Sequence, residues 1–350
     1  MKNQEKIFVI GHKNPDTDSI CSAIAYCDIK NRTTQESRYI PKRAGQINEE
    51  TEYVLNRFGV HPPGYLSNIG TQVKDMDIRL SPEANKSMSL KNAWDLMQEN
   101  SIVSLPIREK DGTLEGLITI GDIAKTYMDT TDSYLLSRAR TQYQRIAETI
   151  GGKVIEGNAH GYFIQGKIMV ATANPDKMKE YVEENDMVIM GNREEDHLQA
   201  IEQNVSCIIV GMGIEVTEKV LKLAHEKDIV IISSPYDTFT ISRLINQSIP
   251  VSFVMKRDNM VTFNTEDFTD DIQDVMIKNR HRAFPVINPH GKCIGTISRR
   301  NFLDMHKKKV VLVDHNEVDQ AVDNIEKAEI LEIIDHHKLG TLQTMTPVAF

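Results

Sequence analysis

The chain contains an internal repeat, and this repeat limits the folds that it can adopt. Residues 100–119, NSIVSLPIREKDGTLEGLIT, align without a gap on residues 279–298, NRHRAFPVINPHGKCIGTIS, at a constant offset of 179. Each copy reads as a helix, a strand, a glycine turn, a second strand and a further helix. The matched positions include Asn100 with Asn279, Pro106 with Pro285, Gly112 with Gly291, Gly116 with Gly295 and Thr119 with Ser298.

A different pattern lies between the two copies, in residues 131–246. Three short apolar runs, at 186–192, 206–211 and 228–234, are separated by segments with helical periodicity such as 216–228. Strands that alternate with helices predict a parallel α/β sheet. The segment shows no cluster of catalytic residue types, which favours a packing or regulatory domain.

The N-terminal region predicts a strand–helix alternation of its own. KIFVI (6–10) and SRYIP (37–41) have the composition of buried strands. Ser19 is placed to cap a helix over 20–31, and the segment 48–59 begins with acidic residues and ends in glycine, as a helix does.

The C-terminal region repeats this alternation. KVVLVDH (309–315) and ILEIIDHH (330–337) are predicted strands that end in polar residues, and 316–328 between them is a predicted helix. Strands of one sheet can be far apart in the sequence when another segment is inserted between them. We therefore expect both ends of the chain to form a single α/β domain.

Three motifs rich in histidine and aspartate follow these predicted strands: GHKNPDTDS (11–19), DHNE (314–317) and DHH (335–337). Taken alone, the first is also typical of an Asx-rich turn and the second of a helix N-cap. Because the carboxyl ends of parallel strands meet at one edge of a sheet, the motifs are expected to share one pocket. Their candidate residues are His12, Asp16, Asp18, Asp314, Asp335, His336 and His337.

The chemistry of such a cluster points to metal ions. Several carboxylates in one pocket repel one another and need cations between them. Imidazole combined with carboxylate suits manganese, cobalt or iron better than calcium. Two such metals joined by a carboxylate can activate water and hold a phosphoryl group. The cluster therefore predicts hydrolysis of a phosphoric anhydride or a phosphodiester.

Composition excludes some other functions. The formal net charge is −9, which argues against nucleic acid held by bulk electrostatics. The four cysteines form no CxxC pair. No run approaches the roughly 20 apolar residues of a membrane helix, so we expect a cytoplasmic protein with reduced thiols and no membrane partner.

The motifs GHKNPDTDS, VDHNE and IDHH, in this order, resemble those of the family II inorganic pyrophosphatases in the DHH phosphoesterase superfamily. The segment RAGQINEETEYVL is also similar to this family, and the insert resembles the regulatory insert of one subclass. The resemblance implies an α/β fold in which a parallel-sheet DHH domain is interrupted by two CBS domains flanking an α/β DRTGG domain. The implied parts are a DHH domain at 1–68 and 309–350, CBS domains at 69–130 and 247–308, and a DRTGG domain at 131–246.

The resemblance also implies roles for the motif residues. In the family, the residues that match His12 and Asp16 bind one metal, and the residue that matches Asp18 binds a second. The residue that matches Asp314 bridges the two metals, and the residue that matches His336 binds the second one. The implied cofactors are Mn²⁺ or Co²⁺, with Mg²⁺ assisting.

For catalysis, the resemblance implies hydrolysis of pyrophosphate to two phosphates. His337 matches a residue that contacts substrate phosphate and is the catalytic candidate, whereas Asp335 is expected to orient its neighbours. A further bridging aspartate and a second DHH-associated domain of the family are not found in these 350 residues. We therefore expect a C-terminally truncated chain, with a partial site and doubtful activity by itself.

The insert is expected to bind adenine nucleotides. CBS pairs place a Thr or Ser and, three residues later, an acid near the ribose; GLITIGD supplies Thr119 and Asp122. GTISRRN supplies Ser298 and, at the acid position, Asn301, with Arg299 as a candidate phosphate contact. The resemblance implies regulation by AMP, ADP or diadenosine polyphosphates and a homodimer. Alternative functions are a non-catalytic adenine-nucleotide sensor and a DHH-type phosphodiesterase.

Overall fold

The chain forms two compact units. In the computed structural model, the described residues are 6–35, 38–128, 132–171, 175–303, 305–340, 343–344 and 348–349. The first unit comprises Met1–Ile78, Phe263–His281 and Ile297–Phe350, and the second comprises Arg79–Thr262 and Arg282–Thr296. Among the described residues, no helix is both long and apolar enough to cross a membrane.

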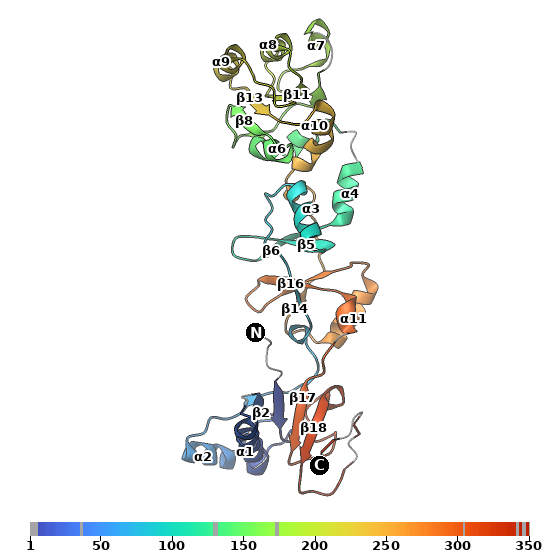
Figure 1. The fold of residues 1–350 in the computed structure, drawn as a ribbon. Coiled ribbons are helices and arrows are strands. Elements are labelled where there is room, and N and C mark those ends of the chain that lie inside the picture. The colour runs from blue at the N-terminus through green and yellow to red at the C-terminus, as the bar shows by residue number, and fades with distance from the viewer. Residues whose placement is uncertain are drawn as a thin grey trace. The chain divides into compact units, whose positions relative to one another are not determined.

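The first unit is built on a parallel sheet of five strands in the order β18-β17-β1-β2-β3 (Figure 1). β1 pairs with β17 in parallel from Ile7 opposite Lys309 to Ile10 opposite Leu312. The expectation that both ends of the chain share one sheet is confirmed. The strands are β1 Ile7–Ile10, β2 Tyr39–Arg43, β3 Gly64–Tyr65, β17 Lys309–Val313 and β18 Glu329–Ile334.

Two helices follow the first strands of this sheet. α2, Glu49–Phe58, is capped by Asn48 and ends before Gly59, as predicted. α1, Thr17–Thr34, begins earlier than predicted and is capped by Asp16, whose side chain accepts a 2.9 Å hydrogen bond from the Ser19 amide. Ser19 was therefore wrongly assigned as the cap. Its buried hydroxyl instead accepts a 3.1 Å hydrogen bond from the His12 amide.

The predicted helix over 316–328 is wrong. This stretch is irregular apart from a 3-10 turn, η5 Ile325–Lys327, which begins after Asn324 in the left-handed conformation (φ 62°). Ala321 and Val322 are buried with Ile325 in the core over the sheet. A regular helix would bury a single apolar stripe. Here adjacent residues are buried by tertiary contacts and Asn324 has a left-handed backbone, so the segment does not form a regular helix.

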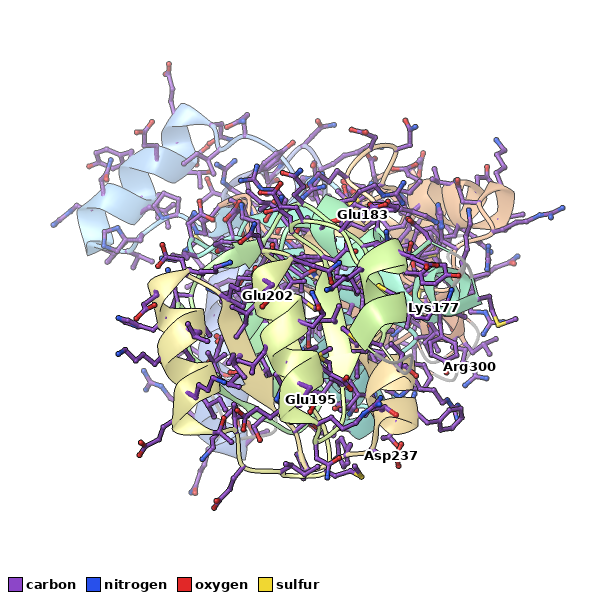
Figure 2. All side chains as sticks on the ribbon, turned by 90° about the horizontal axis from the view of Figure 1, so that it is seen from above. Lys177, Glu183, Glu195, Glu202, Asp237 and Arg300 are labelled. Atoms are coloured by element: carbon purple, nitrogen blue, oxygen red, sulfur yellow. The ribbon has the colours of Figure 1, made fainter. Side chains whose placement is uncertain are left out.

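The second unit contains a sheet in the order β10-β11-β12-β13-β8, in which only β8 is antiparallel to its neighbour. The three apolar runs predicted as strands are confirmed. Exposed Glu195 and Glu202 lie along α8 (Figure 2). The elements are β8 Lys153–Glu156, β10 Ile168–Val170, α7 Pro175–Tyr181, β11 Met187–Met190, α8 Glu194–Glu202, β12 Cys207–Val210, α9 Glu218–Glu226 and β13 Val230–Ser233.

The repeat is confirmed for most of its length. α3, Leu90–Glu99, and α11, Thr269–Lys278, are separated by the same offset at both ends. The matched turn glycines, Gly112 (φ 89°) and Gly291 (φ 76°), both adopt positive φ, which glycine tolerates without strain. The copies differ at their ends, because α4 is a helix and η4 is a 3-10 turn. The remaining repeat elements are β5 Ser104–Arg108, β6 Leu114–Thr119, α4 Ile120–Met128, β15 Phe284–Ile287, β16 Cys293–Ile297 and η4 Arg299–Phe302.

Shorter elements complete the two units. In the first unit they are η1 Val73–Asp75 and β14 Phe263–Asn264; in the second they are β4 Arg79–Leu80, α5 Leu135–Arg138, β7 Thr141–Gln142, α6 Tyr143–Thr149, β9 Tyr162–Phe163, α10 Thr238–Leu244, η2 Ile245–Ser248 and η3 Val251–Phe253.

We predict that Gly45→Ala destabilises the first unit by about 1–3 kcal/mol, the usual cost of overpacking. A Cβ atom at Gly45 would lie 2.0 Å from the Lys13 carbonyl oxygen and 2.6 Å from Pro15 Cδ, so the loop after β1 has to move. Urea unfolding of the full chain measures this loss. Gly64→Ala is the control, because its Cβ would approach only the flexible end of Lys42, at 3.0 Å. Equal stability of the two variants would contradict the prediction.

Candidate functional site

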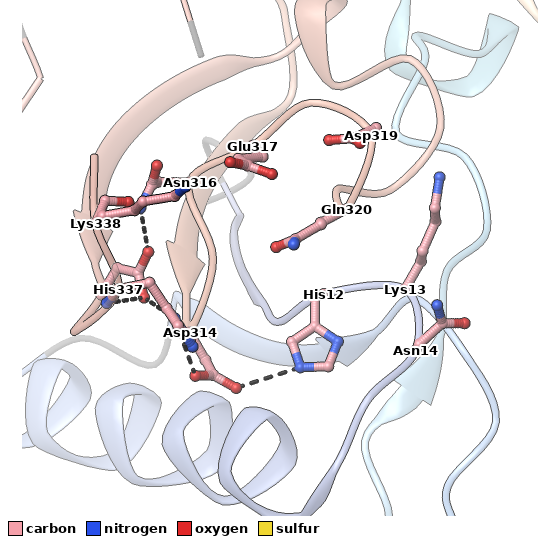
Figure 3. A pocket seen from close by; sticks show the side chains of 11 residues that line it. His12, Lys13, Asn14, Asp314, Asn316, Glu317, Asp319, Gln320, His337 and Lys338 are labelled. Carbon is pink, nitrogen blue, oxygen red and sulfur yellow. Dashed lines mark hydrogen bonds and ion pairs between the residues drawn. The ribbon is translucent and has the colours of Figure 1, made fainter. Parts of the chain in front are cut away.

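The candidate site lies at the carboxyl edge of the parallel sheet in the first unit. β1, β17 and β18 end at Ile10, Val313 and Ile334, and the three predicted motifs begin directly after them. The motifs border a cavity of about 570 Å³ (Figure 3). The cavity is lined by His12, Lys13, Asn14, Asp314, Asn316, Glu317, Asp319, Gln320, Asp335, His337 and Lys338.

Asp314 belongs to two groups of candidate metal ligands. One group combines it with His12 and Asp16, the other with His336 and His337, and within each group one ligand atom per residue lies within 4.8 Å of the others. Asp314 Oδ2 is 3.3 Å from His12 Nε2, whereas Oδ1 is 3.2 Å from His336 Nε2. The two oxygens of one carboxylate therefore face two different ligand groups.

Asp18 completes the cluster from the first turn of α1. Its Oδ2 lies 3.5 Å from His336 Nε2. The structure thus brings together all six residues predicted to bind metal or substrate, although they come from opposite ends of the chain. Imidazole nitrogens and carboxylate oxygens, without a thiolate, fit Mn²⁺ or Co²⁺ better than Ca²⁺.

The backbone at Asp314 explains how its carboxylate reaches both groups. Asp314 follows β17 in the left-handed conformation (φ 61°), which aspartate tolerates better than most residues. Its amide donates a 2.9 Å hydrogen bond to the Ile334 carbonyl oxygen, which fixes this turn to the end of β18. The side chain is only 5% exposed. Burial raises the Asp314 pKa, and the nearby charges of Asp18 and Asp16 raise it further.

Asp335 holds the DHH motif in shape, as expected. Its Oδ1 accepts hydrogen bonds from the His336 amide, the His337 amide and, at 2.7 Å, His337 Nδ1, while Oδ2 accepts one from Asn316. Burial alone would raise the Asp335 pKa, but these hydrogen bonds together lower it. The hydrogen bond to Asp335 also raises the His337 pKa.

Sequence reasoning missed a buried histidine beside the cluster. His315 is 1% exposed, and its Nδ1 lies 2.9 Å from the Val313 carbonyl oxygen. Burial lowers the His315 pKa, and Nδ1 is the donor to Val313 because a carbonyl oxygen can only accept. Its ring packs edge-on to His12, with 6.4 Å between the ring centroids. The position of His315 within the DHNE motif is the sequence signal that points to it.

Two lysines also border the cavity. Lys13 directly follows His12, and Lys338 directly follows the DHH motif. The Lys13 amide donates a 2.8 Å hydrogen bond to the Gln320 carbonyl oxygen, which joins the two walls of the cavity. Both side chains are exposed, and among the described residues neither forms a salt bridge.

The predicted ribose-binding pairs have matching local structures, one in each unit. In the second unit, Asp122 Oδ2 accepts hydrogen bonds from the Thr119 amide (2.9 Å) and hydroxyl (2.6 Å). In the first unit, Asn301 Oδ1 accepts the same two bonds from Ser298, at 2.7 and 2.9 Å. The repeated sequence pattern therefore builds the same hydrogen-bonded turn twice.

Arg299, the candidate phosphate contact, is hydrogen-bonded to backbone carbonyl oxygens of its own unit. Its guanidinium donates to the carbonyl oxygens of Met276 and His281, the latter at 3.2 Å, and also to that of Asn279. These bonds cap the C-terminal end of α11. A phosphate contact by Arg299 would compete with these bonds. The neighbouring Arg300 is exposed (Figure 2), as Arg299 is.

We predict that Asp314→Asn stabilises the metal-free protein at neutral pH but removes most of its stabilisation by Mn²⁺. Asparagine is also tolerated in the left-handed conformation, so the change mainly removes charge. The wild type should gain about 2–4 kcal/mol at Mn²⁺ concentrations 100- to 1,000-fold above Kd. Thermal melting with and without Mn²⁺ measures both effects. Asp319→Asn, in the same cavity but in neither ligand group, should keep the response to Mn²⁺.

The pH dependence of metal-free stability provides a further readout of the same variant. Because the Asp314 pKa is raised on folding, the folded state holds this proton more tightly than the unfolded state. Stability from this group is therefore present at low pH and falls as pH rises from the ordinary aspartate pKa through the raised one. Asp314→Asn should lack this fall. An identical pH profile for wild type and variant would contradict the assignment.

Comparisons with known proteins support the assignment of the insert. The family model described as the CBS domain matches residues 77–129 and 251–308, and the model described as the DRTGG domain matches residues 145–248. A solved structure of the CBS and DRTGG domains of the regulatory region of Clostridium perfringens pyrophosphatase, complexed with the activator diadenosine tetraphosphate, matches with a TM-score of 0.62. The match has 33% identity and covers 65% of this chain and all of the other.

Similarity to curated proteins extends over the whole chain. The cobalt-dependent inorganic pyrophosphatase of Clostridium perfringens is 39% identical over 348 residues, which are 99% of this chain and 63% of that protein. A probable manganese-dependent inorganic pyrophosphatase of Thermotoga maritima is 33% identical over 350 residues, which are 64% of its length. The chain thus spans less than two thirds of these relatives. The chain is therefore homologous, over nearly its whole length, to family II inorganic pyrophosphatases, and its insert carries CBS and DRTGG domains.

Proposed function

We propose that the protein hydrolyses inorganic pyrophosphate to two phosphates with Mn²⁺ or Co²⁺, assisted by Mg²⁺, and that adenine nucleotides regulate it. The observation that carries this proposal is the position of Asp314 between two groups of histidine and aspartate ligands. Metal ions at such a pair of sites supply Lewis acidity and an activated water for attack on phosphorus. The names of the full-length relatives support the choice of pyrophosphate as substrate.

The proposed roles start from the two ligand groups, with Asp18 in place of His337 in the second. His12 and Asp16 would hold one metal, Asp18 and His336 would hold the other, and Asp314, with one oxygen facing each group, would contribute to both. His337, raised in pKa by Asp335, is positioned to donate a proton or a hydrogen bond to a substrate phosphate oxygen. Lys13 and Lys338 border the same cavity and would offset substrate charge.

For the insert, we propose CBS domains at 69–130 and 247–308 and a DRTGG domain at 131–246, with the DHH domain formed from 1–68 and 309–350. The proposed ligands are AMP, ADP and diadenosine polyphosphates, and the activator in the solved relative supports the last class. We also propose a homodimer in the cytoplasm. All four cysteines are free thiols, which is compatible with that compartment.

The first test is phosphate release from pyrophosphate by the full chain. We expect release that requires Mn²⁺ or Co²⁺, changes on addition of AMP, and falls by roughly two to three orders of magnitude in Asp314→Asn. Asp319→Asn should remain active. Release without a transition metal, or full activity of Asp314→Asn, would refute the proposed centre.

An adenine-nucleotide sensor is the second candidate function. The observation that favours it is the preformed Thr119–Asp122 turn, which needs no metal centre. Binding of AMP without any phosphate release would support the sensor and exclude catalysis by this chain. Release from a short oligonucleotide, but not from pyrophosphate, would instead support a DHH-type phosphodiesterase.

We predict that Asp122→Asn weakens AMP binding about tenfold or more, because it removes the charge from the predicted ribose acceptor. Asparagine preserves the turn, as Asn301 accepts the same two hydrogen bonds in the other copy. Asn301→Ala should cost less than about fivefold, since a neutral acceptor is lost. Isothermal titration of AMP into each full-length variant measures both. Equal losses of AMP affinity in the two variants would contradict the proposal that Asp122 contributes more to binding than Asn301.

A further inference from the structure

Asp122, the acidic residue of the predicted ribose-binding pair in the second unit, already forms an ion pair with Lys256 of the same unit. Asp122 Oδ1 lies 3.4 Å from Lys256 Nζ, and the Lys256 side chain is 56% exposed. The other oxygen, Oδ2, accepts both hydrogen bonds from Thr119. Only Oδ1 can therefore accept a hydrogen bond from an incoming ribose, and Oδ1 is the oxygen that is paired with Lys256.

The backbone of Lys256 is fixed beside this site. Lys256 and Leu117 exchange two hydrogen bonds, each 2.9 Å long, which join residue 256 to β6. The approach is close, because a Cβ atom at Gly116 would lie 2.9 Å from the Lys256 carbonyl oxygen. With its backbone held, the lysine can move its ammonium group only within the reach of its own side chain, so the charge stays near Asp122.

Neighbouring cations have other partners. Lys86 lies 2.7 Å from Glu109 and 3.3 Å from Glu115, and Arg257 lies 3.8 Å from Glu115. Of Lys86, Arg257 and Lys256, Lys256 is the cation that pairs with Asp122, the predicted ribose acceptor. A ligand that takes Asp122 Oδ1 therefore displaces Lys256 in particular.

We propose that Lys256 selects phosphorylated nucleotides over nucleosides by exchanging Asp122 for a ligand phosphate. The hydroxyl groups of a ribose diol donate hydrogen bonds to Asp122, and the ammonium group that they displace is left without a nearby anion. The phosphate of AMP supplies one, whereas adenosine leaves the lysine with water only. This inference rests on the proposed nucleotide binding at Thr119 and Asp122.

The test compares AMP and adenosine binding to the full chain by isothermal titration. In Lys256→Ala, AMP affinity should fall about fivefold, the value of one partly exposed charge pair. Adenosine affinity should stay the same or rise, because Asp122 no longer has a competitor. The salt dependence of AMP binding should also weaken. Lys256→Arg should retain AMP binding, since the positive charge remains.

Lys86→Ala is the matched control, because this lysine has similar exposure, 48%, and lies in the same unit, but its partners are Glu109 and Glu115. It should change neither affinity. Parallel losses for AMP and adenosine in Lys256→Ala, or no loss for AMP, would overturn the exchange while leaving nucleotide binding intact. A wild-type chain that binds neither ligand would overturn both the exchange and the nucleotide-binding proposal.

Discussion

The parallel pairing of β1 with β17 is the contact on which the candidate site depends. It joins Ile7 to Lys309 and Ile10 to Leu312, residues separated by the whole CBS and DRTGG insert. Parallel strands end at the same edge of a sheet, so the pairing alone places His12 beside Asp314. A one-residue slip would turn the side chains of β17 to the opposite face. The buried apolar residues on both strands therefore fix the register, and the register fixes the ligand geometry.

This geometry concentrates negative charge where metal is expected. Asp314 is buried with its pKa raised, and Asp16 and Asp18 face the same space. Repulsion between these like charges lowers the stability of the metal-free fold. A bound cation would neutralise the charges and restore that stability. The left-handed backbone at Asp314 adds to this local cost, as residues at functional sites often do. The site and the stability of the first unit are therefore linked through one carboxylate.

The sequence predicted the strands and the ligand set because both depend on local patterns. Apolar runs that end in histidine and aspartate place those residues at strand ends. Features set by distant contacts were missed. Ser19 was taken as the cap of α1 because Asp16 was read only as a ligand, although Asp16 has both roles. The helix over 316–328 failed because buried tertiary contacts replaced helical periodicity. Nothing near Arg299 in the sequence indicates that it caps α11.

The two copies of the repeat show how duplication permits divergence in chemistry without a change in local structure. Asp122 and Asn301 accept the same pair of hydrogen bonds from Thr119 and Ser298, so the turn needs an acceptor oxygen but not a charge. The charge at Asp122 is therefore free to serve another purpose. It pairs with Lys256, the cation that we propose a nucleotide phosphate attracts away from Asp122. Asn301 instead donates to the Asp77 carbonyl oxygen, a bond that a carboxylate could not make. The amide at Asn301 therefore adds a structural contact, whereas the carboxylate at Asp122 keeps a charge for the proposed ligand.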